Sequence, residues 1–201
     1  ICGNGFLTIF TGISGVLEKL GLVEKSNSKM YNIVSSQKSK IGRFSVVYDI
    51  IEKDGVRQPY SYVIMREAVG ILAFCGDNIV LIKQYRYIFD SWEYEIPGGM
   101  IEEGESPEEA ALRELREETG YEAEKLVPLG FCYPSLGATT EKMHLFCAEC
   151  GNRNSQKLDC LETISVESIS FASFRKMVAD GTFNQSTGMV ALARYREMFE
   201  K

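Results

Sequence analysis

The chain has 201 residues, of which 45% are apolar and 25% charged, a composition typical of a globular protein with one sizeable core. Its net charge of −6 and pI of about 5.0 argue against nonspecific binding to nucleic acid or to an anionic membrane, because both need a basic surface. We therefore expect no nucleic-acid partner and no membrane partner. The cysteines, read below as free thiols, lead us to expect a cytoplasmic location.

Six cysteines and a single histidine give little support to a metal or disulfide framework. The cysteine spacings are irregular, which favours free thiols in a chain of this size. His144, Cys147 and Cys150 invite a zinc interpretation, but the stretch 143–149 reads as a strand, in which residues three apart point to opposite faces. We expect buried free thiols, and His144 as a strand residue without a special role.

The N-terminal part predicts a helix followed by a linker over residues 1–40. Apolar residues recur at mixed helical spacing from 6 to 22. The apolar run at 6–17 within this stretch is too short to span a bilayer.

Residues 41–66 predict a small β-rich unit. The stretch 43–51 is rich in Val, Phe, Tyr and Ile, Asp54-Gly55 is a strong hairpin signal, and a return strand follows at about 60–66. Such a unit buries little surface alone, so we expect it to contact the main domain or a second subunit.

The remainder, residues 67–201, alternates strands and helices, which indicates an α/β or α+β class with a mixed sheet flanked by helices. A loop containing Gly and Pro at 133–141 is of the kind that carries function. The predicted strands are 68–75, 79–87, 126–132, 143–149 and 164–171, and the predicted helices are 107–118, 174–180 and 187–199.

The helix predicted at 107–118 has clear start and stop signals. Ser106 is a good N-cap, Pro107 suits the first helical position, Glu109 completes a capping box, and Gly120 reads as the residue after the helix end. The apolar face expected to lie on the sheet comprises Ala110, Ala111 and Leu115.

This helix concentrates carboxylates on one side. Glu114 and Glu118 are four residues apart and share a face, which Glu117 flanks. A solvated acidic helix is the simple interpretation, yet like charges at this spacing repel unless a cation offsets them. Arg113 and Arg116 can offset part of the charge, and a hard divalent cation, which selects carboxylate oxygens, can offset more.

The stretch resembles the Nudix box in both residue types and spacing. Tyr121 stands where that family usually has an aliphatic residue. The matching positions are Gly99, five residues, Glu105, seven residues, Arg113-Glu114-Leu115, one residue, Glu117-Glu118, one residue and Gly120.

Flanking residues resemble the ADP-ribose pyrophosphatase branch of that family. They are the runs 81–87 and 92–99, the segment 133–135, and Glu141 before a strand. The branch often has Pro-Ala-Gly where this chain has Pro97-Gly98-Gly99. The resemblance implies a Nudix-like mixed β-sheet sandwiched between helices. It also implies a homodimer in which the N-terminal β-rich unit is exchanged.

The resemblance implies hydrolysis of a nucleoside diphosphate sugar with Mg²⁺ or Mn²⁺ as cofactor, most directly ADP-ribose to AMP and ribose 5-phosphate. Two alternatives stay open: another nucleotide sugar such as GDP-mannose or UDP-glucose, and a Nudix-like module that senses a nucleotide without turning it over. A missing box acid would mark the sensing module, and none is missing here.

The resemblance also assigns expected roles by position. Metal ligands are expected at Glu114, Glu118 and the carbonyl of Gly98. Glu117 is the next expected ligand. Arg113 is expected to orient the glutamates through ion pairs rather than to contact the substrate. Glu105 is expected to do either of these.

Outside the box, Glu162 is nominated to position or deprotonate the attacking water, with Glu141 as its rival. Arg86 suits contact with the diphosphate or the terminal ribose, because Arg forms bidentate contacts with oxyanions. Aromatic contacts to adenine are expected from the N-terminal unit, with Tyr62, Phe44 and Tyr48 as candidates.

Overall fold

The computed structural model describes residues 30–158 and 163–200. The described residues form two compact units, one of residues 30–37 and 48–60 and one of residues 38–47, 61–158 and 163–200. The helix expected at 6–22 lies outside the described residues, as do Cys2 and Cys160.

A three-stranded sheet forms first, with the strands in the order β1-β2-β3. Its strands are β1 (Asn32–Ile41), β2 (Phe44–Lys53) and β3 (Val56–Ile64). Asp54 and Gly55 form the turn between β2 and β3, as the Asp-Gly signal predicts. β1 was expected to be linker; all ten of its residues are exposed, so it lacks the alternation that marks a half-buried strand.

The second sheet has six strands and mixed direction, which confirms the predicted class. The order is β6-β5-β4-β8-β7, and β9 pairs with β5. β4 and β8 are parallel, whereas β5 is antiparallel to β4, β6 and β9, and β7 is antiparallel to β8. The strands are β4 (Ala68–Cys75), β5 (Asn78–Arg86), β6 (Ser91–Glu95), β7 (Tyr121–Cys132), β8 (Met143–Arg153) and β9 (Ile164–Ser170).

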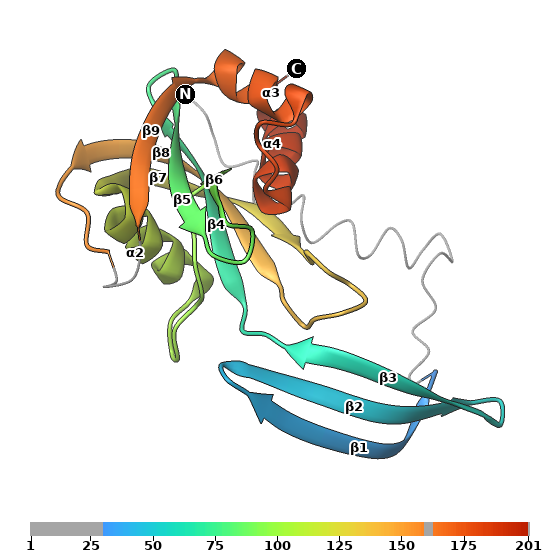
Figure 1. Ribbon diagram of the computed structural model, residues 1–201. Helices are drawn as coiled ribbons and strands as arrows, with labels where there is room; N and C mark the ends of the chain where they lie inside the picture. The colour runs from blue at the N-terminus through green and yellow to red at the C-terminus, as the bar shows by residue number, and fades with distance from the viewer. Residues whose placement is uncertain (1–29, 159–162, 201) are drawn as a thin grey trace, which may run out of the picture. The chain divides into compact units, whose positions relative to one another are not determined.

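Helices cover both faces of this sheet, as the Nudix-like architecture requires (Figure 1). They are α2 (Pro107–Thr119), α3 (Phe171–Asp180) and α4 (Ser186–Phe199). On one face α2 contributes Ala110, Ala111 and Leu115 to a buried cluster with β4, β5 and β8. On the other face α3 and α4 contribute Phe174, Ala191 and Leu192 to a second cluster. Within the described residues, no helix is long and apolar enough to cross a membrane.

Several elements differ from their predicted bounds. β7 begins at Tyr121, five residues earlier than expected, and α3 begins at Phe171, where the Ser170 hydroxyl accepts the N–H of Ser173 at 3.1 Å. β6 was not predicted, since its five residues SWEYE offer too short a pattern. β4 matches its predicted bounds, because a continuous apolar run is typical of a strand buried on both faces.

The segment that precedes α2 is attached to the edge of β4. The N–H groups of Ile71 and Val69 donate to the carbonyls of Pro97 and Gly99, both at 2.8 Å. The N–H of Ile101 donates in turn to the carbonyl of Glu67 at 3.0 Å. This pairing places the glycine segment beside the sheet immediately before the acidic helix.

Candidate active site

Local signals fix both ends of α2. The Ser106 hydroxyl accepts the N–H of Glu109 at 3.2 Å, and the Glu109 carboxylate accepts the N–H of Ser106 at 2.8 Å, which is the predicted capping box. Gly120 has φ of 79° and its N–H donates to the Arg116 carbonyl at 2.9 Å, so the helix ends there. The helix is one residue longer than predicted.

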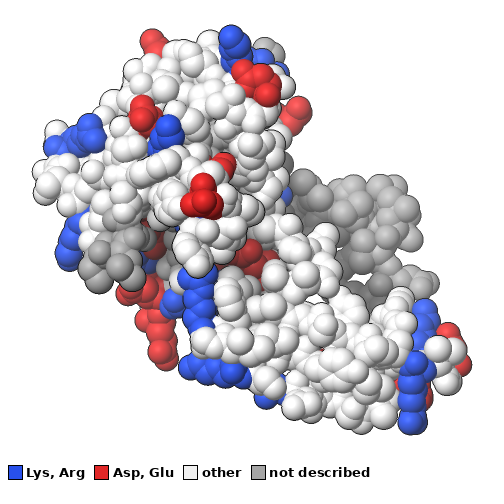
Figure 2. All heavy atoms as spheres, in the orientation of Figure 1, with Lys and Arg blue, Asp and Glu red and all other residues white. Residues whose placement is uncertain are grey.

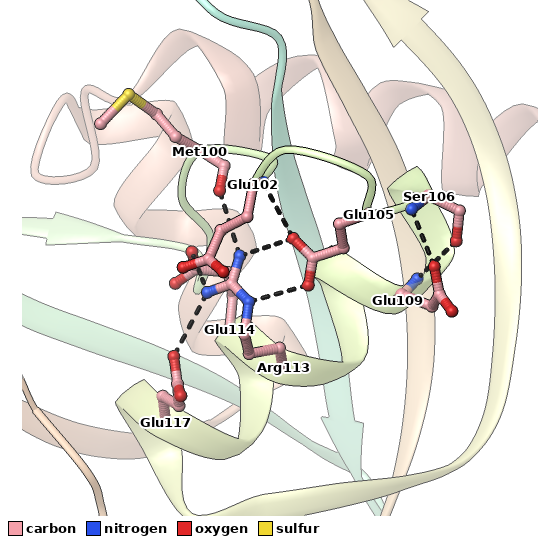
Figure 3. A network of polar contacts seen from close by, with 8 residues as sticks. All are labelled: Met100, Glu102, Glu105, Ser106, Glu109, Arg113, Glu114 and Glu117. Atoms are coloured by element: carbon pink, nitrogen blue, oxygen red, sulfur yellow. Dashed lines mark hydrogen bonds and ion pairs between the residues drawn. The ribbon is translucent and has the colours of Figure 1, made fainter.

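Arg113 lies at the centre of the carboxylate cluster (Figure 3). Its Nε and Nη2 donate to the two oxygens of Glu105 at 2.8 and 2.9 Å. Its Nη1 donates to Glu114 at 2.8 Å and to Glu117 at 3.2 Å, while Nη2 also donates to the Met100 carbonyl at 3.1 Å. One guanidinium therefore fixes the orientation of three carboxylates.

These ion pairs are largely shielded from solvent. The side chains of Arg113 and Glu105 are 19% and 14% exposed. Hydrogen bonds from Arg113 lower the pKa of Glu105, and the same bonds raise the pKa of Arg113. Both groups are therefore fully charged at neutral pH, which balances part of the negative charge on α2.

Two consecutive glycines allow α2 to approach the sheet segment. The buried carboxylate of Glu118 accepts the N–H of Gly98 at 2.8 Å. A Cβ at Gly99 would lie 2.4 Å from Glu114 Oε1, and one at Gly98 would lie 2.1 Å from the Val69 carbonyl oxygen. Any side chain here would displace the backbone or the carboxylates, so the Gly-Gly pair sets the spacing of the site.

The donor set suits a hard divalent cation. Glu114, Glu117 and Glu118 offer carboxylate oxygens, the ligands that Mg²⁺ and Mn²⁺ prefer, beside the Gly98-Gly99 backbone. Over residues 30–158 and 163–200, no group of three or more His, Cys, Asp or Glu is close enough to hold a metal ion. The structure brings the box residues together by two contacts: Arg113 joins Glu105, Glu114 and Glu117, and Glu118 accepts the N–H of Gly98.

The loop after β8 attaches to the last turn of α2. The amide of Gln156 donates to the Glu118 carbonyl at 2.5 Å, and the N–H of Lys157 donates to the Glu117 carbonyl at 2.9 Å. These bonds satisfy carbonyls that a helix end leaves unpaired. The sequence interpretation missed both residues, because a polar loop gives no local signal of its target. Glu162 lies outside the described residues.

Arg86 forms a bidentate ion pair instead of lying alone in a pocket. Its Nε and Nη2 both lie 2.5 Å from the carboxylate of Glu95, whose side chain is 11% exposed. The amide of Gln185 donates to the same carboxylate at 3.0 Å. Arg86 and Glu95 line a cavity of about 490 Å³, together with Phe89, Glu93, Tyr94, Asn184, Gln185 and Ser186. The sequence interpretation identified Arg86 but missed Glu95 and Gln185.

Glu141 is half-buried in the loop before β8. Burial raises the pKa of its carboxyl. No hydrogen bond or ion pair joins its side chain to the box residues in the part of the chain that the structure describes. Its role, like those of the aromatic candidates Phe44, Tyr48 and Tyr62 in β2 and β3, stays a prediction.

His144 and the described thiols make contacts within and beside the central sheet. His144 Nε2 lies 2.6 Å from Glu67 Oε2, a contact that lowers the pKa of Glu67. Cys147 lies in the cluster on the α3 and α4 face and Cys150 contacts the cluster on the α2 face, as strand parity predicts. Burial raises the pKa of Cys147 to about 11 and that of Cys150 to about 12. The four described cysteines are free: Cys75, Cys132, Cys147 and Cys150.

Charged side chains are interspersed on the surface seen in Figure 2. Among the described residues on that face, acidic and basic groups form small clusters separated by wide uncharged areas. Within each unit, the described residues on this face form no continuous basic track of the kind that binds a nucleic-acid backbone.

The mixed sheet between helices and the glutamate-rich helix behind a Gly-Gly segment define a Nudix-type fold. The family model described as the NUDIX domain matches residues 65–186, and the chain belongs to that family. Within the family it resembles the ADP-ribose pyrophosphatase branch, as the flanking residues predict.

Three comparisons illustrate this similarity. The ADP-ribose pyrophosphatase of Bacillus subtilis (strain 168) is 46% identical over 83 residues, which are 41% of this chain and 45% of that protein. The ADP compounds hydrolase NudE of Escherichia coli (strain K12) is 31% identical over 151 residues, 74% of this chain and 81% of that protein. A crystal structure of an ADP compounds hydrolase superposes with a TM-score of 0.78 at 29% identity, over 86% of this chain and 95% of that chain. The chain thus spans less than half the length of the first relative and most of the other two.

Proposed function

We propose that the protein is a divalent-metal-dependent pyrophosphohydrolase of nucleoside diphosphate sugars, with ADP-ribose hydrolysed to AMP and ribose 5-phosphate as its principal reaction. The observation that carries the proposal is the cluster of Glu105, Glu114 and Glu117 around Arg113, beside the Gly98–Glu118 contact. The relatives named for activity on ADP-ribose and ADP compounds support the choice of substrate.

In this proposal Glu114 and Glu118, with the carbonyl of Gly98, hold Mg²⁺ or Mn²⁺, and Glu117 is a further ligand. Bound divalent cations neutralise the charge of a diphosphate and lower the pKa of a coordinated water. Arg113 orients Glu114 and Glu117, since its guanidinium already donates to both. Glu105 anchors that guanidinium from its other edge.

The remaining residues bind substrate and handle a proton. Arg86 contacts an anionic oxygen of the substrate, because it lines the cavity with its guanidinium held by Glu95. Glu162 positions or deprotonates water, with Glu141 as the alternative, whose raised pKa suits a group that accepts a proton. The acidic charge and the free described thiols also fit the cytoplasmic location that we propose.

Product analysis on a panel of nucleotides tests the proposal. ADP-ribose, GDP-mannose, UDP-glucose and NADH are each incubated with the protein and Mg²⁺, then with excess chelator. Metal-dependent release of AMP, fastest from ADP-ribose, is the expected result. Faster cleavage of another sugar nucleotide would change the substrate and keep the chemistry, whereas tight binding without turnover would support a sensing module.

A further inference from the structure

Gln185 occupies the N-cap position of α4 without capping the helix. Its backbone is extended, with φ of −70° and ψ of 114°, and its side chain makes no hydrogen bond to the first turn. Ser, Thr, Asp and Asn are the usual N-cap residues because their short side chains reach that turn. The longer amide of Gln185 reaches instead to the end of β6, 90 residues away along the chain.

Two contacts fix the orientation of this amide. The N–H of Ile96 donates to Gln185 Oε1 at 2.9 Å, and Gln185 Nε2 donates to Glu95 Oε2 at 3.0 Å. The opposite orientation would set an NH₂ group against a backbone N–H and a carbonyl oxygen against a carboxylate, so it is excluded. The amide therefore ties α4 to the strand that leads directly into Pro97.

The carboxylate of Glu95 transmits this constraint to Arg86. It accepts one hydrogen bond from Gln185 and two from Arg86, and it is nearly buried. Arg86 is 41% exposed and faces the cavity of about 490 Å³ that Gln185 also lines. A flexible arginine is thereby presented to the cavity in one orientation, which lowers the entropy cost of binding an anion.

We propose that Gln185 is a positioning residue that holds Glu95 in place and so orients Arg86 toward a phosphate oxygen of the substrate. The inference rests on the proposed function for the identity of the ligand. Gln185 acts through Glu95 and Arg86, so its loss weakens substrate binding more than it slows the chemical step.

The substitution Gln185→Asn separates this role from a structural one. Asparagine is a preferred N-cap, so α4 should be as stable as before or more so, while the side chain is one methylene too short to bridge Ile96 and Glu95. The better N-cap offsets part of the cost of the two lost hydrogen bonds, so we expect a Tm within a few degrees of the wild type. We expect a KM for ADP-ribose raised about tenfold, as for the loss of a hydrogen bond to a charged group, and kcat within about twofold. Asn152→Gln, an exposed amide on β8 that does not line the cavity, should keep wild-type values.

A double-mutant cycle with Arg86→Gln tests whether the effect passes through Arg86. In that background Gln185→Asn should change KM by less than about twofold, because no guanidinium is left to orient. An equal effect in both backgrounds would overturn the proposal, and so would an unchanged KM in the single variant.

The same proteins separate this inference from the proposed function. If the wild-type chain binds ADP-ribose but cleaves no nucleotide of the panel, the proposed function fails, and calorimetric Kd values for ADP-ribose replace KM. A Kd about tenfold weaker in Gln185→Asn than in the wild type would then support the role of Gln185, and equal values would overturn it. A wild-type chain that binds no nucleotide of the panel overturns both.

Discussion

Arg113 illustrates how one residue stabilises a helix that its own charges oppose. Glu114 and Glu117 would repel on neighbouring positions of α2, yet both accept hydrogen bonds from the same guanidinium. Glu105 completes the arrangement from the loop before the helix. Glu118 lies outside this Arg113 network, and its carboxylate accepts the N–H of Gly98 in the sheet segment instead.

We expect Glu118→Gln to lower kcat by at least about 100-fold, because the amide keeps the shape but loses the charge that a divalent cation needs. The measurement is steady-state hydrolysis of ADP-ribose over a range of Mg²⁺ concentrations. Glu108→Gln, an exposed acid in the first turn of α2, is the matched control and should retain wild-type activity. Full activity in Glu118→Gln would contradict the proposed metal site.

The Glu105–Arg113 pair predicts a pH dependence of stability. Arg113 lowers the pKa of Glu105 in the folded state below its unfolded value of about 4.3. The stabilisation is therefore fully present above that value and is lost as pH falls through the folded pKa. Glu105→Gln should cost about 1.5–3 kcal/mol in free energy of unfolding at pH 6, with a smaller cost at pH 3.5.

Urea denaturation of the wild type and Glu105→Gln at both pH values provides the measurement. The two unfolding curves should lie closer together at the lower pH, because protonated Glu105 resembles glutamine. A difference that stays constant between pH 6 and 3.5 would show that the loss comes from packing rather than from the ionised carboxylate.

At the scale of elements, the start of α2 contributes to stability, whereas the glycine segment before it shapes the proposed active site. The capping box stabilises the helix start and touches no ligand-binding group, whereas Gly99 lies against the Glu114 carboxylate. Changes at these two places should therefore have opposite signatures.

We expect Gly99→Ala to reduce kcat/KM at least tenfold with a change in unfolding free energy below about 1 kcal/mol. The new methyl would meet the end of the Glu114 side chain, which can move aside by giving up its hydrogen bond to Arg113 but then leaves its position in the site. Ser106→Ala should instead cost about 1 kcal/mol of stability while the folded protein keeps its activity. Thermal unfolding and ADP-ribose hydrolysis of both variants test this prediction. Equal losses of activity in Gly99→Ala and Ser106→Ala would contradict it.

The same elements show what the sequence could predict. The bounds of α2 followed from Ser106, Glu109 and Gly120, because caps are local signals read within one turn of the helix. β1 escaped prediction because no residue of it is buried, so no hydrophobic period exists to detect. Box spacing located the carboxylates, but the Gln185–Glu95 contact joins residues 90 apart and depends on how α4 lies against the end of β6.

At the scale of the whole molecule, the three-stranded sheet leaves much apolar surface exposed. Ile33 and Ile41 on β1 are 56% and 65% exposed, and other large apolar side chains on the three strands are also exposed. They are Val34, Phe44, Tyr48, Val56, Tyr60 and Ile64. Many exposed large apolar side chains on one small sheet are typical of a surface that contacts a partner.

We therefore expect the protein to be a homodimer that uses this sheet, and Ile33→Asp combined with Ile41→Asp to shift it toward the monomer. Burying two isoleucines contributes about 1.5–3 kcal/mol each, and charged replacements add a desolvation cost, so the dimer Kd should rise at least about 100-fold. Sedimentation velocity over a range of protein concentrations measures the shift. Leu112→Asp, an exposed aliphatic position on α2, is the control and should leave the dimer intact. A wild-type chain that sediments as a monomer at micromolar concentration would contradict the dimer, and a doubly substituted chain that stays dimeric would place the interface elsewhere.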